Sequence, residues 1–257
     1  MHRSAELARG GARRRPAPVV SSGRAAALLL TLAALPVPAL AQVGHSPGRS
    51  PYRDIRKGHM VTPIFGQFGG SGGRFEIGPH DGQTYGLRYD VRTGSAVQVG
   101  LGVAHASLTR LVVDPFVELA NRTSGPVDQS VTFAEINVQL NLTGGKSWHR
   151  LAPFVSAGAG LTFPVSTPQD TSRFNFGKKF YLAPSTGVRV FVTDRVSLRG
   201  EARAVFWKLK YPTTFQDEPA LEPGTPDHSN AVITDGRVTE WSTSSWLLVG
   251  VGIGFSP

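Results

Sequence analysis

Apolar and polar residues alternate one by one along much of this 257-residue chain, and that period of two limits its fold more than any other feature. The pattern is clearest near the C-terminus, where a bulky apolar row alternates with glycines at positions 250, 252 and 254. That row is Leu247, Val249, Val251, Ile253 and Phe255. Successive side chains of a β-strand point to opposite faces, so the alternation predicts a strand with one apolar face.

Eight segments show this period. They cover residues 59–68, 83–91, 95–105, 131–142, 151–163, 180–193, 195–208 and 241–255. A tilted strand needs about 9–11 residues to cross the hydrocarbon layer of a membrane, and each segment is long enough to do so. No apolar run after residue 41 reaches the length of a membrane-spanning helix, so a membrane-embedded chain must cross as strands.

The connections between these segments alternate strictly between short and long. The short ones are residues 92–94, 143–150 and 193–195, and the long ones are residues 69–82, 106–130, 164–179 and 210–240. Eight antiparallel strands with both chain ends on one side have three turns on that side and four on the other. The pattern therefore predicts short periplasmic turns and long extracellular loops.

The two faces of the segments indicate which side of the barrel is apolar. In segment 131–142, the apolar row with Ile136 and Val138 opposes a polar row with Glu135, Asn137 and Gln139. A membrane barrel is apolar outside and polar inside, whereas a soluble ligand-binding barrel is the reverse. We therefore predict an all-β fold, an eight-stranded antiparallel transmembrane β-barrel.

The polar rows carry charged residues that would meet in the lumen. They are Arg88, Asp90, Arg92, Glu135, Arg189, Arg199, Glu201 and Arg203. The interior of an eight-stranded barrel is only wide enough for side chains, so these groups must satisfy one another or a few waters. We expect a closed, salt-bridged plug; the alternative is a narrow anion-preferring path, since five arginines face three acids.

Aromatic residues near the ends of the segments fit the belts that mark membrane interfaces. They are Tyr85, Tyr89, Phe163, Phe180, Tyr181, Phe206, Trp207, Tyr211, Trp241 and Trp246. The phase of the alternation puts Trp207 and Trp246 on the inward row. For these two, a lumenal role and a belt role both stay open.

The first 41 residues have the features of a cleavable signal peptide. A positive start precedes the short apolar run 25–35, and the small-residue site Ala39-Leu40-Ala41 follows. We therefore expect a signal peptide at residues 1–41, an N-terminal periplasmic segment at 42–58 and the barrel domain at 59–257. This organisation predicts export to the bacterial outer membrane.

Composition argues against several other functions. The net charge of +9 falls to about +4 without the signal peptide, and the remaining basic residues form no stripe, so nucleic-acid binding is not expected. Cysteine is absent, and His59, His80, His149 and His228 lack ligand spacing, so we expect no metal site. We predict no cofactor. The prolines and acids of residues 210–240 indicate a mobile surface loop.

With these features the chain resembles the bacterial outer membrane protein β-barrel domain family, the small eight-stranded barrels. The resemblance extends from about Met60 to the end and includes the final segment WLLVGVGIGF. It implies outer-membrane lipid as the surroundings and the barrel-assembly machinery as a partner during biogenesis, but no particular activity. Members usually end on an aromatic residue, whereas here Ser256 and Pro257 follow Phe255.

One pair of residues raises the possibility of catalysis. His105 and Ser107 form an H-x-S pair on the lipid-facing row, which is similar to the base and nucleophile of outer-membrane lipid A deacylases. The flanking residues differ from that pattern, and only Asp114 or Glu118 would be near enough in sequence to orient the histidine. No catalysis is otherwise evident.

Four functions therefore remain open at the level of sequence. We favour an outer-membrane barrel with a structural, surface-interaction or narrow, porin-like channel role. The alternatives are a lipid-modifying hydrolase and a soluble lipocalin-like binding barrel. The ligand of the long loops, if there is one, is not identified by the sequence.

Overall fold

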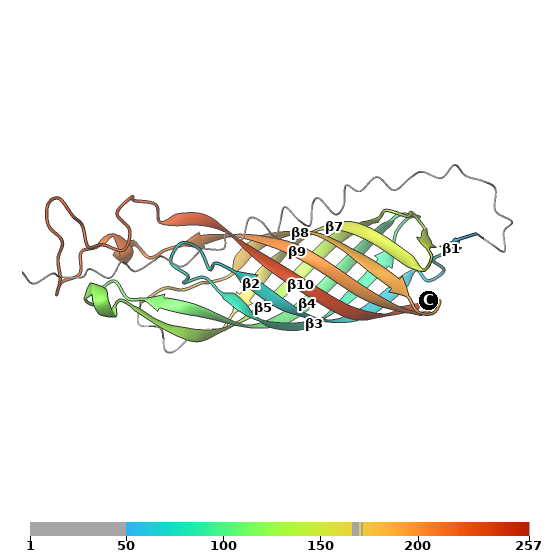
Figure 1. Cartoon of the computed structure of the whole chain (residues 1–257), viewed down its shortest axis with the longest axis horizontal. Coiled ribbons are helices and arrows are strands. Elements are labelled where there is room, and N and C mark those ends of the chain that lie inside the picture. The colour runs from blue at the N-terminus through green and yellow to red at the C-terminus, as the bar shows by residue number, and fades with distance from the viewer. Residues whose placement is uncertain (1–49, 166–169, 171, 257) are drawn as a thin grey trace, which may run out of the picture. The chain divides into compact units, whose positions relative to one another are not determined.

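The computed structural model describes residues 50–165, 170 and 172–256, and these form a closed barrel (Figure 1). Its eight long strands are β2 (His59–Gly70), β3 (His80–Arg92), β4 (Val97–Val113), β5 (Thr123–Asn141), β7 (Leu151–Pro164), β8 (Lys179–Phe191), β9 (Val196–Lys210) and β10 (Thr239–Phe255). Each strand pairs antiparallel with its neighbours, and the pairing of β10 with β2 closes the sheet. The predicted eight-stranded antiparallel barrel is confirmed.

The remaining elements of the described chain are short. The strand β1 (Tyr52–Asp54) pairs with β6 (Lys146–Trp148), and single 3₁₀ turns occur at η2 (Leu119–Asn121) and η3 (Thr213–Gln216). Among the described residues, no helix is long and apolar enough to span a membrane. The predicted signal peptide lies outside the described residues.

Strand register sets the tilt of the barrel. Following paired residues once around the sheet from Arg189 leads back to β8 at Lys179, ten residues away. A stagger of this size tilts the strands by about 35–45° and leaves an interior that side chains fill. The inclined strands are visible in Figure 1.

The connections alternate between the two ends of the barrel, as predicted, but they are not strictly sorted by length. Residues 93–96, 142–150 and 192–195 turn at the end that carries the C-terminus, and the connections that follow β2, β4, β7 and β9 lie at the other end. The connection 142–150 is as long as 71–79 and 114–122. The loop predicted at 106–130 is shorter, because β4 and β5 continue as a hairpin beyond the predicted segments. A register shift between Arg110 and Val112 interrupts the period of two there, which hides the strand in the sequence.

The outward rows form an apolar belt around the barrel. Phe65, Leu101, Ile136 and Leu247 each expose more than half of their surface, although they lie on four different strands. Exposed apolar residues in such numbers are not tolerated in water but suit lipid, whereas the inward rows are polar. The barrel is therefore of the transmembrane kind.

The outer half of the barrel encloses a hydrophobic core that continues into the loops. Phe215 and Ile233 of the connection 211–238 are buried in it, so the prediction of a mobile loop there is not matched by its packing. Tyr181 and Tyr211, which were predicted for the interfacial belt, are also buried in this core. The inward direction of Tyr181 follows from the phase of β8, whereas Tyr211 directly follows β9 and packs against Phe75 and Phe215 of the loops.

Candidate functional site: the charged lumen

The inward rows of four strands bring most of the predicted charged residues together. Arg88 and Asp90 lie on β3, Glu135 on β5, Arg189 on β8, and Arg199, Glu201 and Arg203 on β9. All seven side chains are buried. Arg92, the last residue of β3, is partly buried. The register around the sheet brings the inward residues of these strands close enough to bond to one another across the lumen.

Glu201 is the centre of this layer. Its carboxylate accepts hydrogen bonds from Nε of Arg199 and Nε of Arg203, both at 2.8 Å. Nη1 of Arg88 lies 3.7 Å from Oε2, and Ser185 donates to Oε1 at 2.7 Å. One acid therefore neutralises three arginines only in part, and the layer needs its other acids.

Two further acids complete the network. Nη1 of Arg203 donates to both carboxylate oxygens of Glu135, and Nε of Arg88 donates to Asp90 at 2.8 Å. Arg88 also donates to the side-chain oxygen of Asn137. Buried ion pairs cost less when further hydrogen bonds satisfy their remaining atoms, and the amide of Asn137 and the hydroxyl of Tyr181 do this here.

Two of the predicted arginines are not paired with an acid in the described residues. Arg189 donates to Asn141 at 2.7 Å, and Arg92 donates to the backbone oxygen of Ile55. Both lie toward the end of the barrel that carries the C-terminus. The excess positive charge of the lumen is therefore concentrated on that side.

Glycines make room for the charged layer. A Cβ at position 158 would lie 2.7–3.0 Å from the carboxylate of Glu135, and a Cβ at position 160 would lie 2.7 Å from the ring of Tyr181. Both contacts are closer than real Cβ atoms make. The glycines of β7 therefore let large inward side chains from other strands occupy the lumen.

An aromatic layer lies next to the charged layer, on the side away from the end that carries the C-terminus. The ring centroids of Phe68 and Trp207 are 5.5 Å apart, and those of Phe133 and Trp246 are 5.0 Å apart. Trp207 and Trp246 are both buried inside the barrel, so both take the lumenal role. Nε1 of Trp246 donates to Thr84 at 2.8 Å. The cavity between the two layers measures about 10 Å³, which is space for about one water.

A comparison with solved structures finds similarity to small outer-membrane proteins. Neisserial surface protein A is 13% identical to this chain, with 80% of this chain and 98% of that one covered and a TM-score of 0.47. OprG from Pseudomonas aeruginosa is 11% identical to this chain, with 81% of this chain and 100% of that one covered and a TM-score of 0.48. The attachment invasion locus protein Ail of Yersinia pestis is 13% identical, with 77% of this chain and 99% of that one covered and a TM-score of 0.37. No family model and no curated protein matches the sequence.

The two residues of the H-x-S pair lie on β4, where His105 contacts other residues than Ser107. Nδ1 of His105 lies 3.2 Å from the hydroxyl of Thr132, and its ring packs against Tyr85. No hydrogen bond joins His105 to Ser107 among the described residues. Asp114, one of the two candidate orienting acids, accepts the backbone N–H of Phe116 at 2.9 Å. The described residues also hold no group of three potential metal ligands.

Proposed function

We propose that this chain is an exported outer-membrane barrel that is closed to solutes and presents a packed cap of loops at the cell surface. The observation that carries the proposal is the filling of the lumen by two successive layers, one charged and one aromatic. A structural and surface-interaction role follows from a lumen that offers no path.

The charged layer opposes passage because its groups are bonded to one another across the barrel. A solute would have to separate pairs such as Arg203 with Glu135, which are buried and lie at 2.8–2.9 Å. Breaking a buried pair leaves an uncompensated charge and costs about 3–5 kcal/mol. The layer therefore favours a plug over the anion-preferring path.

The aromatic layer closes the outer half by a different means. Trp207 and Phe68 are fully buried, and the closely packed rings leave no space for a hydrated ion. Well-packed interiors contain few voids larger than a water molecule. The two layers together favour a closed barrel over a narrow channel.

The extracellular loops are tied to one another, which supports a surface role. Arg74 pairs with Asp235 at 2.8 Å and lies over the rings of Phe75 and Tyr211. The backbone N–H of Leu119 donates to Glu222 at 2.9 Å, which joins the second and fourth loops. Ordered loops need less ordering when a partner binds, so they present a pre-organised surface.

Two measurements test this proposal. The first is membrane fractionation with heat-modifiability on gels, in which an unboiled barrel should migrate faster than the boiled sample. The second is conductance of the purified barrel in planar bilayers, with a general diffusion porin measured in parallel. We expect a heat-modifiable outer-membrane protein without conductance steps. Reproducible steps would show a channel, and recovery in the soluble periplasm would exclude the membrane barrel.

A further inference from the structure

The N-terminal segment closes part of the periplasmic end of the barrel. β1 pairs with β6, and the backbone N–H of Ile55 donates to the oxygen of Gly145 at 2.9 Å. The side chain of Ile55 is buried there. Figure 1 shows β1 at the same end as the C-terminus. This arrangement creates a small pocket between the segment and the periplasmic turns.

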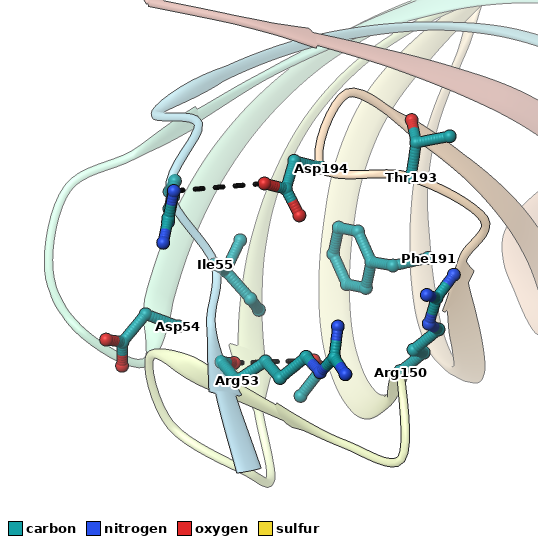
Figure 2. Close-up of a pocket in the computed structure, with 9 residues that line it drawn as sticks. Arg53, Asp54, Ile55, Arg150, Phe191, Thr193 and Asp194 are labelled. Atoms are coloured by element: carbon teal, nitrogen blue, oxygen red, sulfur yellow. Dashed lines mark hydrogen bonds and ion pairs between the residues drawn. The ribbon is translucent and has the colours of Figure 1, made fainter. Parts of the chain in front are cut away.

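We call this space the mouth pocket. Its lining consists of Arg53, Asp54, Ile55, Arg56, Ser147, Arg150, Phe191, Thr193 and Asp194. Its volume is about 50 Å³, which is space for a few waters or for one oxyanion group. In Figure 2 the side chain of Arg53 extends below the ring of Phe191 toward the side that carries Arg150, the side chain of Arg150 runs along the wall beside that ring, and Asp54 is turned away.

The positive charge of the mouth pocket is not fully neutralised. Asp194 lies 3.9 Å from Arg56, as the dashed line in Figure 2 marks. Among the described residues, no carboxylate lies within 4 Å of the guanidinium of Arg53 or Arg150. Arg150 uses Nη1 to donate to the backbone oxygen of Val192 at 2.6 Å, so its other nitrogens remain to face the pocket. Three arginines and two aspartates therefore line the pocket, and neither Arg53 nor Arg150 forms an ion pair with those acids.

The backbone that carries Arg150 is strained. His149 and Arg150 have φ angles of 47° and 69°, the left-handed region that residues other than glycine rarely adopt. The conformation is held from both sides, because His149 N–H donates to Pro51 at 2.9 Å and Phe191 N–H donates to Arg150 at 2.8 Å. Such strain persists where surrounding contacts impose it and is concentrated at ligand-binding positions. Here the strained residue Arg150 belongs to the lining of the mouth pocket.

The wider periplasmic rim has the same sign of charge. Its described basic residues are Arg53, Arg56, Lys57, Arg92, Lys146, Arg150 and Arg195, and its acids are Asp54 and Asp194. In a transmembrane barrel this end lies at the level of the lipid headgroups of the periplasmic leaflet. A basic rim raises the local concentration of anions at the mouth pocket.

We propose that the mouth pocket binds one phosphate group between Arg53 and Arg150. The planar fork of a guanidinium matches phosphate oxygens, and charge-assisted hydrogen bonds of this kind are stronger than neutral ones. The phosphate comes either from the headgroup of an anionic phospholipid or from free inorganic phosphate. This site is separate from the closed lumen and goes beyond the function proposed above.

Binding of inorganic phosphate tests the pocket directly. The mature protein, folded in a non-ionic detergent and a phosphate-free buffer, is titrated with phosphate in a calorimeter at ionic strength held constant with chloride. We expect saturable binding that Arg53→Gln or Arg150→Gln each weakens by about tenfold or more. Arg195→Gln is the matched control, because it removes a rim charge outside the pocket, and it should bind as the wild type does.

A second arm identifies the source of the phosphate. The same four proteins are placed in nanodiscs of phosphatidylcholine with a minority of phosphatidylglycerol, and the lipid retained by the barrel is measured by native mass spectrometry. Retention of phosphatidylglycerol that both pocket variants lose indicates a lipid headgroup. Phosphate binding without lipid retention indicates free phosphate.

Heat-modifiability first establishes that every variant is folded. Because Arg53 lies on β1, Arg53→Gln tests the pocket without changing the strained turn that contains Arg150. The proposal is overturned if neither ligand binds the wild type, or if both pocket variants bind as well as the wild type does. It is also overturned if Arg195→Gln weakens binding equally, since that result would indicate the diffuse charge of the rim.

Discussion

Arg203 on β9 reaches Glu135 on β5, and its Nη1 donates to both carboxylate oxygens, at 2.9 and 2.8 Å. The two strands are not neighbours, because β7 and β8 separate them on one side of the sheet. The pair therefore crosses the lumen and does not join two adjacent strands. It links the side of the network that contains Glu201 to the side that contains Asn137.

Removing the central acid should destabilise the barrel strongly. Glu201→Gln keeps the shape of the side chain but leaves Arg88, Arg199 and Arg203 without their shared carboxylate. We expect a loss of about 3–5 kcal/mol in the free energy of unfolding, measured by urea titration in lipid bilayers. Asp227→Asn, on an exposed loop, is the control. Equal stabilities of the two variants would contradict a structural role for the network.

Truncating a tryptophan inside the lumen and truncating one on the outside of the barrel should change the stability of the protein by different amounts. Trp207 is fully buried in the aromatic layer, whereas Trp241 exposes 62% of its surface. We expect Trp207→Ala to cost about 3–5 kcal/mol of unfolding free energy, because it leaves a cavity among packed rings. Trp241→Ala should cost clearly less, because it leaves no cavity inside the barrel. A similar cost for both would mean that the aromatic layer is loosely packed.

The H-x-S pair should be dispensable for lipid chemistry. His105 is engaged with Thr132, so no base is positioned for the hydroxyl of Ser107. We expect cells that express Ser107→Ala or the wild type to have the same lipid A species by mass spectrometry. Species of lipid A that lack acyl chains and disappear in Ser107→Ala would instead establish the hydrolase.

The cap should weaken at high pH through Tyr211. Burial, and then the neighbouring Glu240 carboxylate, raise the pKa of Tyr211 above its ordinary value. The unfolded chain releases this proton from about pH 10, where the folded chain still holds it, so stability is present below that pH and falls as the pH rises above it. Unfolding free energies measured across this range should fall less steeply for Tyr211→Phe. An unchanged slope would show that Tyr211 ionises as freely in the folded chain as in the unfolded chain.

The alternation of residues was sufficient to predict the barrel and the faces of its strands. Side chains along a strand alternate with a period of two, so Glu135, Arg199 and Arg203 were assigned to the lumen without knowledge of their neighbours. The same phase put Trp207 and Trp246 on the inward row. The alternation of short and long connections in the sequence also predicted an antiparallel arrangement, because successive turns of an antiparallel barrel lie at opposite ends.

The partners of these side chains depended on the register between strands. Phase assigns a residue to a face but not to a height, and the stagger of ten residues around the sheet decides that Glu201 meets Arg88 from β3. The extension of β4 and β5 was hidden by a bulge, and the packing of Phe215 and Ile233 into the cap involves contacts between distant loops.

The sequence by itself thus determined the fold class, the number of strands and the side of the sheet on which each charge lies, because these follow from a local period. Only the tertiary structure decided that the lumen is filled by a charged and an aromatic layer and that Arg53 and Arg150 meet at one pocket. Those features arise where strands and segments far apart in the chain are brought to the same height, and no local pattern carries that information.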